Sequence, residues 1–165
     1  MTSGSGIIDQ LLKDTSIPRV LKIRQNFERP VLGDVEAAVL DRLRSSHVLD
    51  RLRPGMSIAV GVGSRGISNQ PLIVRVLVDR LKSQGARPFI FPAMGSHGGA
   101  TAEGQREVLE GYGITESYVD CPIHSQMDVV ELGKVDGMPV YMDKVAAGAD
   151  GVVVLCRIKP HTNFR

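Results

Sequence analysis

Residues 57–66 read SIAVGVGSRG, and this stretch decides the fold. It begins as a short apolar run, typical of a strand that is buried on both faces, and it ends in a glycine-rich loop. Two further runs of the same kind occupy residues 88–93 and 151–156. Short buried strands of this type are typical of parallel sheets, in which helices connect one strand to the next.

The segments around these strands carry the signals of helices and of a hairpin. Residues 34–49, 69–85 and 101–111 repeat apolar side chains at helical spacing, and the last two ranges begin at a capping residue and end at a glycine. Residues 127–132 and 138–142 are expected to pair as a hairpin around an Asp-Gly turn. This order predicts a three-layer, Rossmann-like α/β fold with a mostly parallel sheet, helices on both faces and a β-hairpin excursion.

The remaining segments complete the expected organisation. Residues 18–25 alternate apolar and basic side chains, which suggests a half-exposed strand, and residues 146–149 suggest a short helical piece. We expect residues 1–16 to form a mobile N-terminal tail and residues 17–165 to form one α/β domain. The chain stops soon after its third buried strand, without the crossover helix expected next, so we expect a fragment of a longer protein.

Composition narrows the classes of function. The chain has 165 residues, of which 42% are apolar and 23% charged, the ordinary mixture of a soluble globular domain. Its formal charge of +2 is spread along the chain, and no apolar run approaches the ~20 residues that cross a membrane. We therefore expect neither a nucleic-acid partner nor membrane insertion. Cys121 and Cys156 have no spacing that suggests zinc or a disulfide framework, which fits a reducing cytoplasm.

Three candidate functional loops directly follow the three buried strands, and they carry Arg65, His97 and residues 159–161, Lys-Pro-His. Because ligands of parallel sheets bind at the carboxyl ends of the strands, these loops should open at one edge. The guanidinium of Arg65 suits a substrate carboxylate, although it could instead pair with a carboxylate of the protein. His97 lies among small residues before a helix, where an imidazole can exchange protons near neutral pH.

Residues 61–66 also match the G-x-G-x-x-G pattern of dinucleotide-binding loops. That pattern requires an acidic residue at the end of the following strand, whereas this strand ends in Pro92-Ala93-Met94. This context argues against a dinucleotide site, and a nicotinamide-binding oxidoreductase is kept only as the weaker alternative. The motifs of zinc proteases, α/β-hydrolases and Walker-type nucleotide hydrolases do not occur in the sequence.

From about residue 57 to the end, the chain resembles the nickel-pincer lactate racemase family. Several motifs carry the resemblance, and they follow one another in the same order as in the family. Residues 63–65, Gly-Ser-Arg, are similar to the first substrate loop of the family, which often reads Asp-x-Thr-Arg, so the arginine is kept and the acidic residue is absent. Residues 95–97, Gly-Ser-His, are similar to the Gly-Thr-His of the family. Residues 132–150 resemble the segment that leads to the second catalytic histidine, and His161 resembles that histidine.

The resemblance implies the N-terminal catalytic domain of a racemase or epimerase of a lactate-like 2-hydroxy acid. One histidine would take the hydroxyl proton while the pincer carbon of the cofactor accepts the α-hydrogen as hydride. Return of the hydride to the opposite face, with a proton from the other histidine, would invert the carbon. We assign the catalytic role to His97 and His161, substrate binding to Arg65, Ser64, Ser96 and Lys159, and cofactor contacts to Gly95, Gly98 and Gly99. Lys159 could equally be an ordinary solvated lysine.

The cofactor implied by the resemblance is a nickel pincer nucleotide, which the family anchors through a lysine and a nickel-binding histidine that lie further along than Arg165. No metal ligand is therefore expected here, and the chain alone is predicted to be inactive. The expected partners are a small 2-hydroxy acid, the C-terminal domain of the parent chain and, as an open option, a second copy of the chain in a homo-oligomer. A non-catalytic anion-binding or assembly domain is the alternative from another class.

Overall fold

The computed structural model describes residues 5–16 and 18–159, and the chain divides into two units, residues 1–31 and 32–165. The first unit holds helix α1 (Ser5–Leu12), which the sequence analysis did not predict. Its residues 18–31 have no regular secondary structure, so the predicted strand at 18–25 is wrong. An alternating pattern marks two faces of an extended segment, but a strand also needs a partner for its backbone hydrogen bonds.

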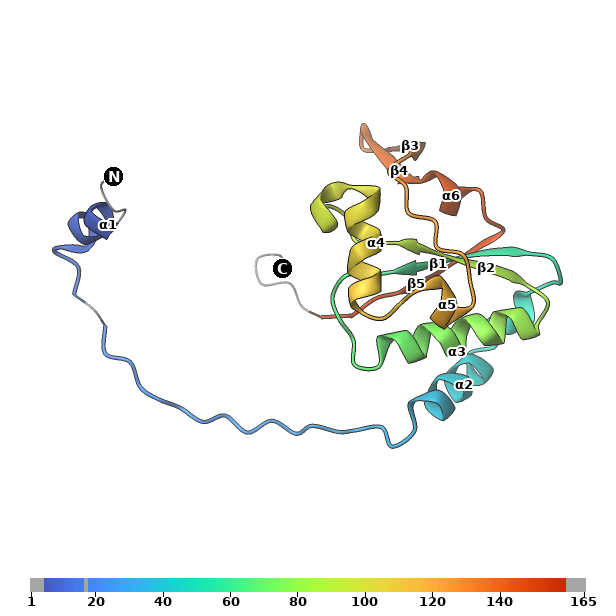
Figure 1. The fold of residues 1–165 in the computed structure, drawn as a ribbon, viewed down its shortest axis with the longest axis horizontal. Coiled ribbons are helices and arrows are strands. Elements are labelled where there is room, and N and C mark those ends of the chain that lie inside the picture. The colour runs from blue at the N-terminus through green and yellow to red at the C-terminus, as the bar shows by residue number, and fades with distance from the viewer. Residues whose placement is uncertain (1–4, 17, 160–165) are drawn as a thin grey trace. The chain divides into compact units, whose positions relative to one another are not determined.

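The second unit is built on a parallel sheet, whose described strands follow the order β2-β1-β5 (Figure 1). Strand β1 (Ser57–Val62) lies in the centre, between β2 (Arg87–Pro92) and β5 (Gly151–Leu155). The register places Val62 beside Pro92 on one side and beside Leu155 on the other, so the three strands end at the same edge. The predicted parallel sheet is confirmed. The expected burial of the third strand on both faces is wrong, because Val152 and Val154 of the edge strand β5 are 41% and 64% exposed.

Helices and a hairpin surround this sheet, as the sequence predicts (Figure 1). The hairpin pairs its two strands antiparallel, with left-handed backbone at Asp136 (φ 49°) and Gly137 (φ 80°) in the turn, as expected for an Asp-Gly connection. The other elements of the second unit are α2 (Val35–Ser45), the 3-10 helix η1 (Val48–Arg51), α3 (Gln70–Ser83), η2 (Gly98–Ala100), α4 (Ala102–Gly111), α5 (Glu116–Val119), β3 (Val129–Val135), β4 (Met138–Asp143) and α6 (Lys144–Ala147).

Alternation along β1 sends side chains into two separate cores, because successive residues of a strand point to opposite faces. Ile58 and Val60 belong to the larger core, which α3 and α4 complete on one face of the sheet. Ala59 belongs to a smaller cluster on the other face, with Phe91 of β2 and Ala146 of α6. Helical residues thus cover both faces, and the mixed α/β architecture agrees with the predicted Rossmann-like class.

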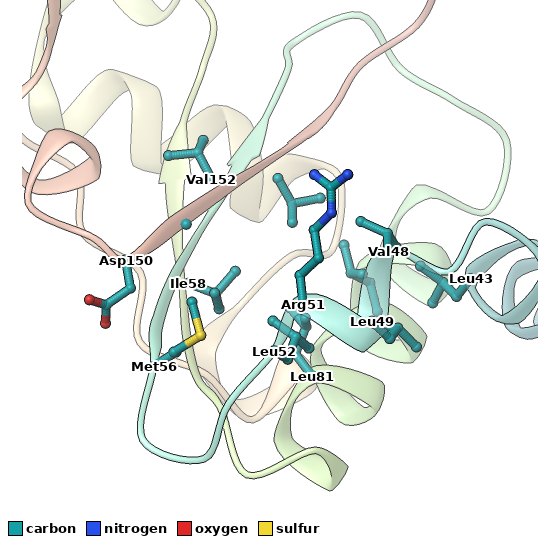
Figure 2. A pocket seen from close by; sticks show the side chains of 13 residues that line it. Leu43, Val48, Leu49, Arg51, Leu52, Met56, Ile58, Leu81, Asp150 and Val152 are labelled. Carbon is teal, nitrogen blue, oxygen red and sulfur yellow. The ribbon is translucent and has the colours of Figure 1, made fainter.

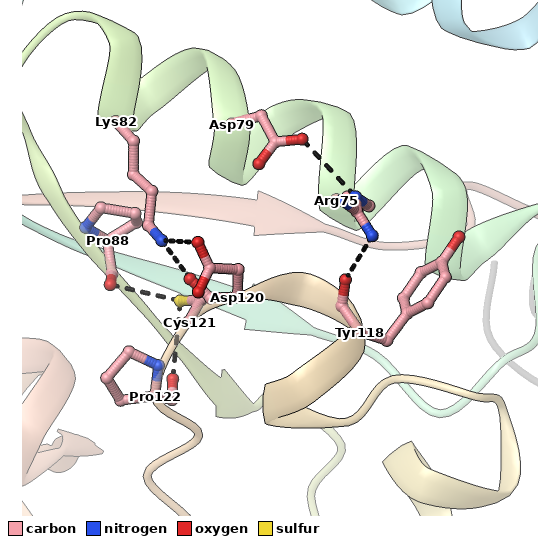
Figure 3. Close-up of polar contacts among 8 residues, drawn as sticks. All are labelled: Arg75, Asp79, Lys82, Pro88, Tyr118, Asp120, Cys121 and Pro122. Atoms are coloured by element: carbon pink, nitrogen blue, oxygen red, sulfur yellow. Dashed lines mark hydrogen bonds and ion pairs between the residues drawn. The ribbon is translucent and has the colours of Figure 1, made fainter.

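Helix α3 is tied to the segment around α5 by polar contacts that Figure 3 displays. The Lys82 ammonium donates to the Asp120 carboxylate at 2.8 Å, and this hydrogen bond lowers the pKa of that carboxyl. Beside them, Cys121 is buried, and burial raises the pKa of its thiol to about 11. Cys121 and Cys156 are both free, in line with the absence of a disulfide framework expected from their spacing.

Asp150 joins the beginning of β5 to the beginning of β1. Its carboxylate accepts hydrogen bonds from the Ser57 backbone N–H at 2.8 Å and from the Ser57 hydroxyl at 2.9 Å. The backbone hydrogen bond is the main reason that the pKa of Asp150 lies below its ordinary value. A lowered pKa in the folded state means that this stabilisation is present above the unfolded pKa of about 3.9 and disappears as the pH falls through the folded pKa.

We therefore expect Asp150→Asn to lower the free energy of unfolding at pH 7 and to matter less as the carboxyl protonates. Urea denaturation of the wild type and of the variant, followed from pH 7 down to about pH 2, checks this expectation. The wild type should lose stability more steeply than the variant below about pH 4.5, where an ordinary carboxyl begins to protonate. Parallel pH curves for the two proteins would contradict the role given to this carboxylate.

Candidate functional site

The carboxyl edge of the sheet is held together across all three strands. The Gly63 N–H donates to the Leu155 carbonyl at 3.2 Å, and the Ala93 N–H donates to the Val62 carbonyl at 2.9 Å. Loop 1 (residues 63–69) therefore starts between the ends of β2 and β5. The chain leads from β1 to β2 on one side of β1, whereas β5 lies on the other side. The strand order therefore reverses at β1, and the carboxyl ends of the strands at such a topological switch point are where α/β sheets bind ligands.

Two loops of this edge contact each other through a pair of polar side chains. The Ser64 hydroxyl oxygen, in loop 1, lies 2.6 Å from Nδ1 of His97, in loop 2 (residues 93–101). This contact occupies Nδ1, so Nε2 is the nitrogen that the imidazole offers to a ligand. Both residues were predicted for the site, with Ser64 as a substrate ligand, and here its hydroxyl orients the histidine. A hydroxyl beside one ring nitrogen fixes the direction from which the other can exchange a proton.

A buried glutamine at the start of α3 holds the beginning of loop 1. Gln70 is only 2% exposed, and its side-chain amide donates to the Gly63 carbonyl at 3.2 Å. The side-chain oxygen of Gln70 accepts from the Ile67 N–H at 3.3 Å. Helix α3 begins only at this residue, four positions after Gly66, so the glycine-rich stretch does not lead straight into a helix as a dinucleotide loop does.

Loop 2 rests on the first turns of α4. The Gln105 side-chain amide donates to the Gly95 carbonyl at 2.7 Å and to the His97 carbonyl at 3.3 Å. Gly98 has a left-handed φ of 65°, and a Cβ there would lie 2.5 Å from the Gly104 carbonyl carbon. Glycine at positions 98 and 104 lets the two backbones approach closely, which holds the backbone of loop 2 against the helix.

The other predicted site residues have different surroundings. Arg65 is exposed beside Ser64, and none of the ion pairs found among the described residues includes it. Ser96 is exposed in loop 2, next to His97. Lys159 is exposed after β5, and His161 lies outside the described residues. The structure thus brings Ser64 and His97 together, and the predicted roles of Lys159 and His161 stay predictions.

Of two cavities near the sheet, one lies far from the site and the other lies beside loop 2. The first has a volume of about 330 Å³ and lies among apolar side chains such as Met56 and Ile58 (Figure 2). It is at the beginning of β1 and thus at the end of the sheet remote from His97. A second, of about 340 Å³, is lined by Gln105 with Asp128 and Asp143, beside loop 2. Carboxylates in that lining would repel an anionic ligand, so an anion is better placed at the exposed side of the Ser64 and His97 pair.

A comparison with family models decides which family these loops belong to. The model described as the lactate racemase N-terminal domain matches residues 4–164. The chain belongs to this family. The resemblance seen in the motifs is confirmed, and the family is part of lactate racemase, an isomerase. Searches of curated proteins and of solved structures found no match.

The described residues of this chain do not fit a bound nickel ion. No group of three or more His, Cys, Asp or Glu side chains in residues 5–16 and 18–159 is placed to hold a metal. In the same ranges, no helix combines the length and the apolar character needed to cross a bilayer. We therefore assign no described side chain to the metal and derive no chemical step through the nickel pincer nucleotide.

The side chains that hold loop 1 and loop 2 were not predicted from the sequence. Gln70, Gln105 and Tyr112 were not singled out, although the first two are the buried polar side chains found among the described residues. A signal was present, because Gln105 lies one turn before the fully buried Leu109 and therefore on the apolar face of α4. A polar residue on a buried helical face requires hydrogen-bond partners, and here these are the carbonyl groups of loop 2.

Proposed function

We propose that this chain is the substrate-binding and acid–base portion of a racemase or epimerase of a 2-hydroxy acid. Family membership supports the reaction class, since the family takes its description from lactate racemase. The observation that carries the proposal is the 2.6 Å contact between the Ser64 hydroxyl and His97 Nδ1 at the carboxyl edge of the sheet. It gives this edge an oriented imidazole, which proton transfer at a substrate hydroxyl requires.

In this proposal each residue acts on a different part of the substrate. Arg65 binds the carboxylate through its fork of N–H donors, and its exposure leaves that fork accessible. His97 accepts or donates the hydroxyl proton at Nε2, while Ser64 keeps the ring in place through Nδ1. When the carbon is inverted, the hydroxyl group must exchange its proton on either side of the substrate, so a second base is needed, and His161 is proposed for this role.

The proposal also includes a cofactor and the small residues of loop 2. A nickel pincer nucleotide is proposed as the cofactor, held by residues of a C-terminal part of the protein, in keeping with the family being described as an N-terminal domain. Ser96, Gly95, Gly98 and Gly99 of loop 2 are proposed to lie along the ligand, since three of them are glycines with left-handed backbone that let a bound molecule approach closely.

The test is the interconversion of enantiomers by the full-length protein loaded with its cofactor. Single enantiomers of lactate and of larger 2-hydroxy acids are supplied, and chiral chromatography follows the appearance of the other enantiomer. We expect conversion of at least one acid, with Arg65→Gln raising the KM about 10-fold or more, because a charge-assisted pair is worth about 1.5–3 kcal/mol. Binding of these acids without conversion would contradict the proposal and favour the alternative, a non-catalytic anion-binding domain.

A further inference from the structure

One helix carries the side chains that hold both candidate loops. Gln105, in the second turn of α4, donates to the carbonyl groups of Gly95 and His97 in loop 2. Tyr112, the residue that caps the end of α4, donates its hydroxyl to the Ser64 carbonyl in loop 1. These two positions are seven residues apart, about two helical turns, so they lie on the same face of the helix.

The burial of the glutamine makes its contacts specific. Gln105 is 4% exposed, so its amide group interacts with these carbonyl oxygens and not with bulk water. Loss of such a donor leaves acceptors without their partner, which costs about 1–3 kcal/mol when the group is buried. The backbone of loop 2 would then move to recover hydrogen bonds, and the imidazole of His97 would move with it.

The contact between the two loops depends on both attachments. Ser64 and His97 come from the ends of different strands, and the 2.6 Å contact joins only their side chains. Without a common support, two exposed loops would sample many relative positions, since each loop has its own backbone freedom. Helix α4 supplies that support, because its packed residue Leu109, between the two attachment points, is fully buried in the main core.

We propose that Gln105 and Tyr112 are positioning residues, which fix the Ser64 and His97 loops on α4 and thereby set the orientation of the His97 imidazole. Neither side chain needs to touch the substrate. The catalytic meaning of this inference rests on the proposed function, whereas the geometry it describes is a property of the chain itself. In a reaction that transfers a proton at Nε2, this orientation decides how closely the ring can align with a substrate hydroxyl.

The test reads the imidazole directly in the 165-residue chain, without substrate, cofactor or turnover. Nuclear magnetic resonance of isotope-labelled histidine gives the ring-nitrogen shifts of each histidine, and Ser64→Ala defines the shift that follows loss of the contact to Nδ1. Gln105→Met removes the amide donors at similar side-chain size, and Tyr112→Phe removes only a hydroxyl. Matched controls are Gln84→Met, at the end of α3, and Tyr118→Phe, whose ring lies 5.4 Å from the Arg75 guanidinium.

We expect both test variants to move the His97 signals in the direction seen for Ser64→Ala, and both controls to leave them in place. The signals of His47 and His124 should stay unchanged in every variant, because a general loss of structure would move them too. Unmoved His97 signals in a folded Gln105→Met or Tyr112→Phe protein would overturn the proposal. Simultaneous movement of all histidine signals would also overturn it, since the effect would then not be specific to this loop.

The two proposals can fail independently. If the full-length protein converts no 2-hydroxy acid but the His97 signals respond as expected, the positioning role stands and the proposed function does not. If conversion occurs but the His97 signals ignore both substitutions, the imidazole is oriented by other residues and only the positioning role is wrong.

Discussion

Replacement of His97 by glutamine is expected to lower the kcat of the loaded full-length protein about 100-fold or more. Glutamine can still donate and accept hydrogen bonds, but it cannot take up a proton near neutral pH, and general acid–base catalysis is worth about 100- to 10,000-fold. Chiral chromatography of the interconverted hydroxy acid measures this loss. Ser64→Ala should cost less, about 2- to 10-fold, because it removes one hydrogen bond that orients the ring.

The matched control for this prediction is His47→Gln. His47 is exposed at the start of η1, where its ring lies 3.1 Å from the Asp50 carboxylate. No hydrogen bond or ion pair found among the described residues joins it to loop 1 or loop 2. The control variant should therefore convert substrate at the wild-type rate. A His97→Gln enzyme that keeps wild-type kcat would contradict the assignment of this histidine, whatever the result for Ser64→Ala.

Replacement of Gly104 by alanine is expected to destabilise the protein by about 1–3 kcal/mol, although alanine normally favours a helix over glycine. A Cβ at this position would overlap the Gly98 carbonyl oxygen of loop 2 and would lie 2.9 Å from Oγ1 of Thr101, which caps α4. Both neighbours are fixed, because the Thr101 hydroxyl oxygen accepts from the Gly104 N–H and donates to that same carbonyl. Loop 2 must therefore move away from the helix to make room.

The same helix provides the control. Gly111→Ala changes the last residue of α4, where a Cβ would meet nothing within 4 Å and the backbone is not left-handed. This variant should be as stable as the wild type or more stable, by up to about 1 kcal/mol. Urea denaturation of the three proteins measures the difference. Equal stabilisation by both alanines would show that loop 2 does not rest on α4 as described.

The agreement between sequence and structure is closest where local signals point to one element. The apolar run that ends in a glycine-rich loop predicts β1, and the structure places this strand at Ser57–Val62. Thr101 was expected to cap a helix running towards Gly111, and its side chain accepts from the Gly104 N–H at the start of α4. Capping and burial are encoded within a few residues, so such elements can be recognised without the rest of the fold.

Other elements could not be recognised in this way. Helix α5 spans only Glu116–Val119, too short for its apolar spacing to be visible, and its stability depends on contacts with α3. Residues 18–25 show the alternation of a strand but form none. Strand formation depends on a hydrogen-bond partner from elsewhere in the chain, and the alternation of side chains carries no information about that partner.

The candidate site, like the fold, was predicted only in part from the sequence. The order of strands and loops placed Arg65, Ser64 and His97 at one edge of the sheet, because parallel strands end together. The order of strands and loops does not predict which of these side chains are in contact. The 2.6 Å contact between Ser64 and His97 depends on how two loops from different strands are supported. That support comes from Gln105 and Tyr112, whose partners are backbone carbonyl groups with no signature in the sequence.

The amino-acid sequence by itself determined the parallel α/β fold, the family and the loops that carry the candidate chemistry, because hydrophobic patterns, caps and motifs are local. Only the tertiary structure decided that the Ser64 hydroxyl contacts the His97 ring and that α4 holds loop 1 and loop 2. Such contacts join residues far apart in the chain, and their existence depends on packing that fixes distances to a fraction of an ångström, which no pattern of residue types specifies.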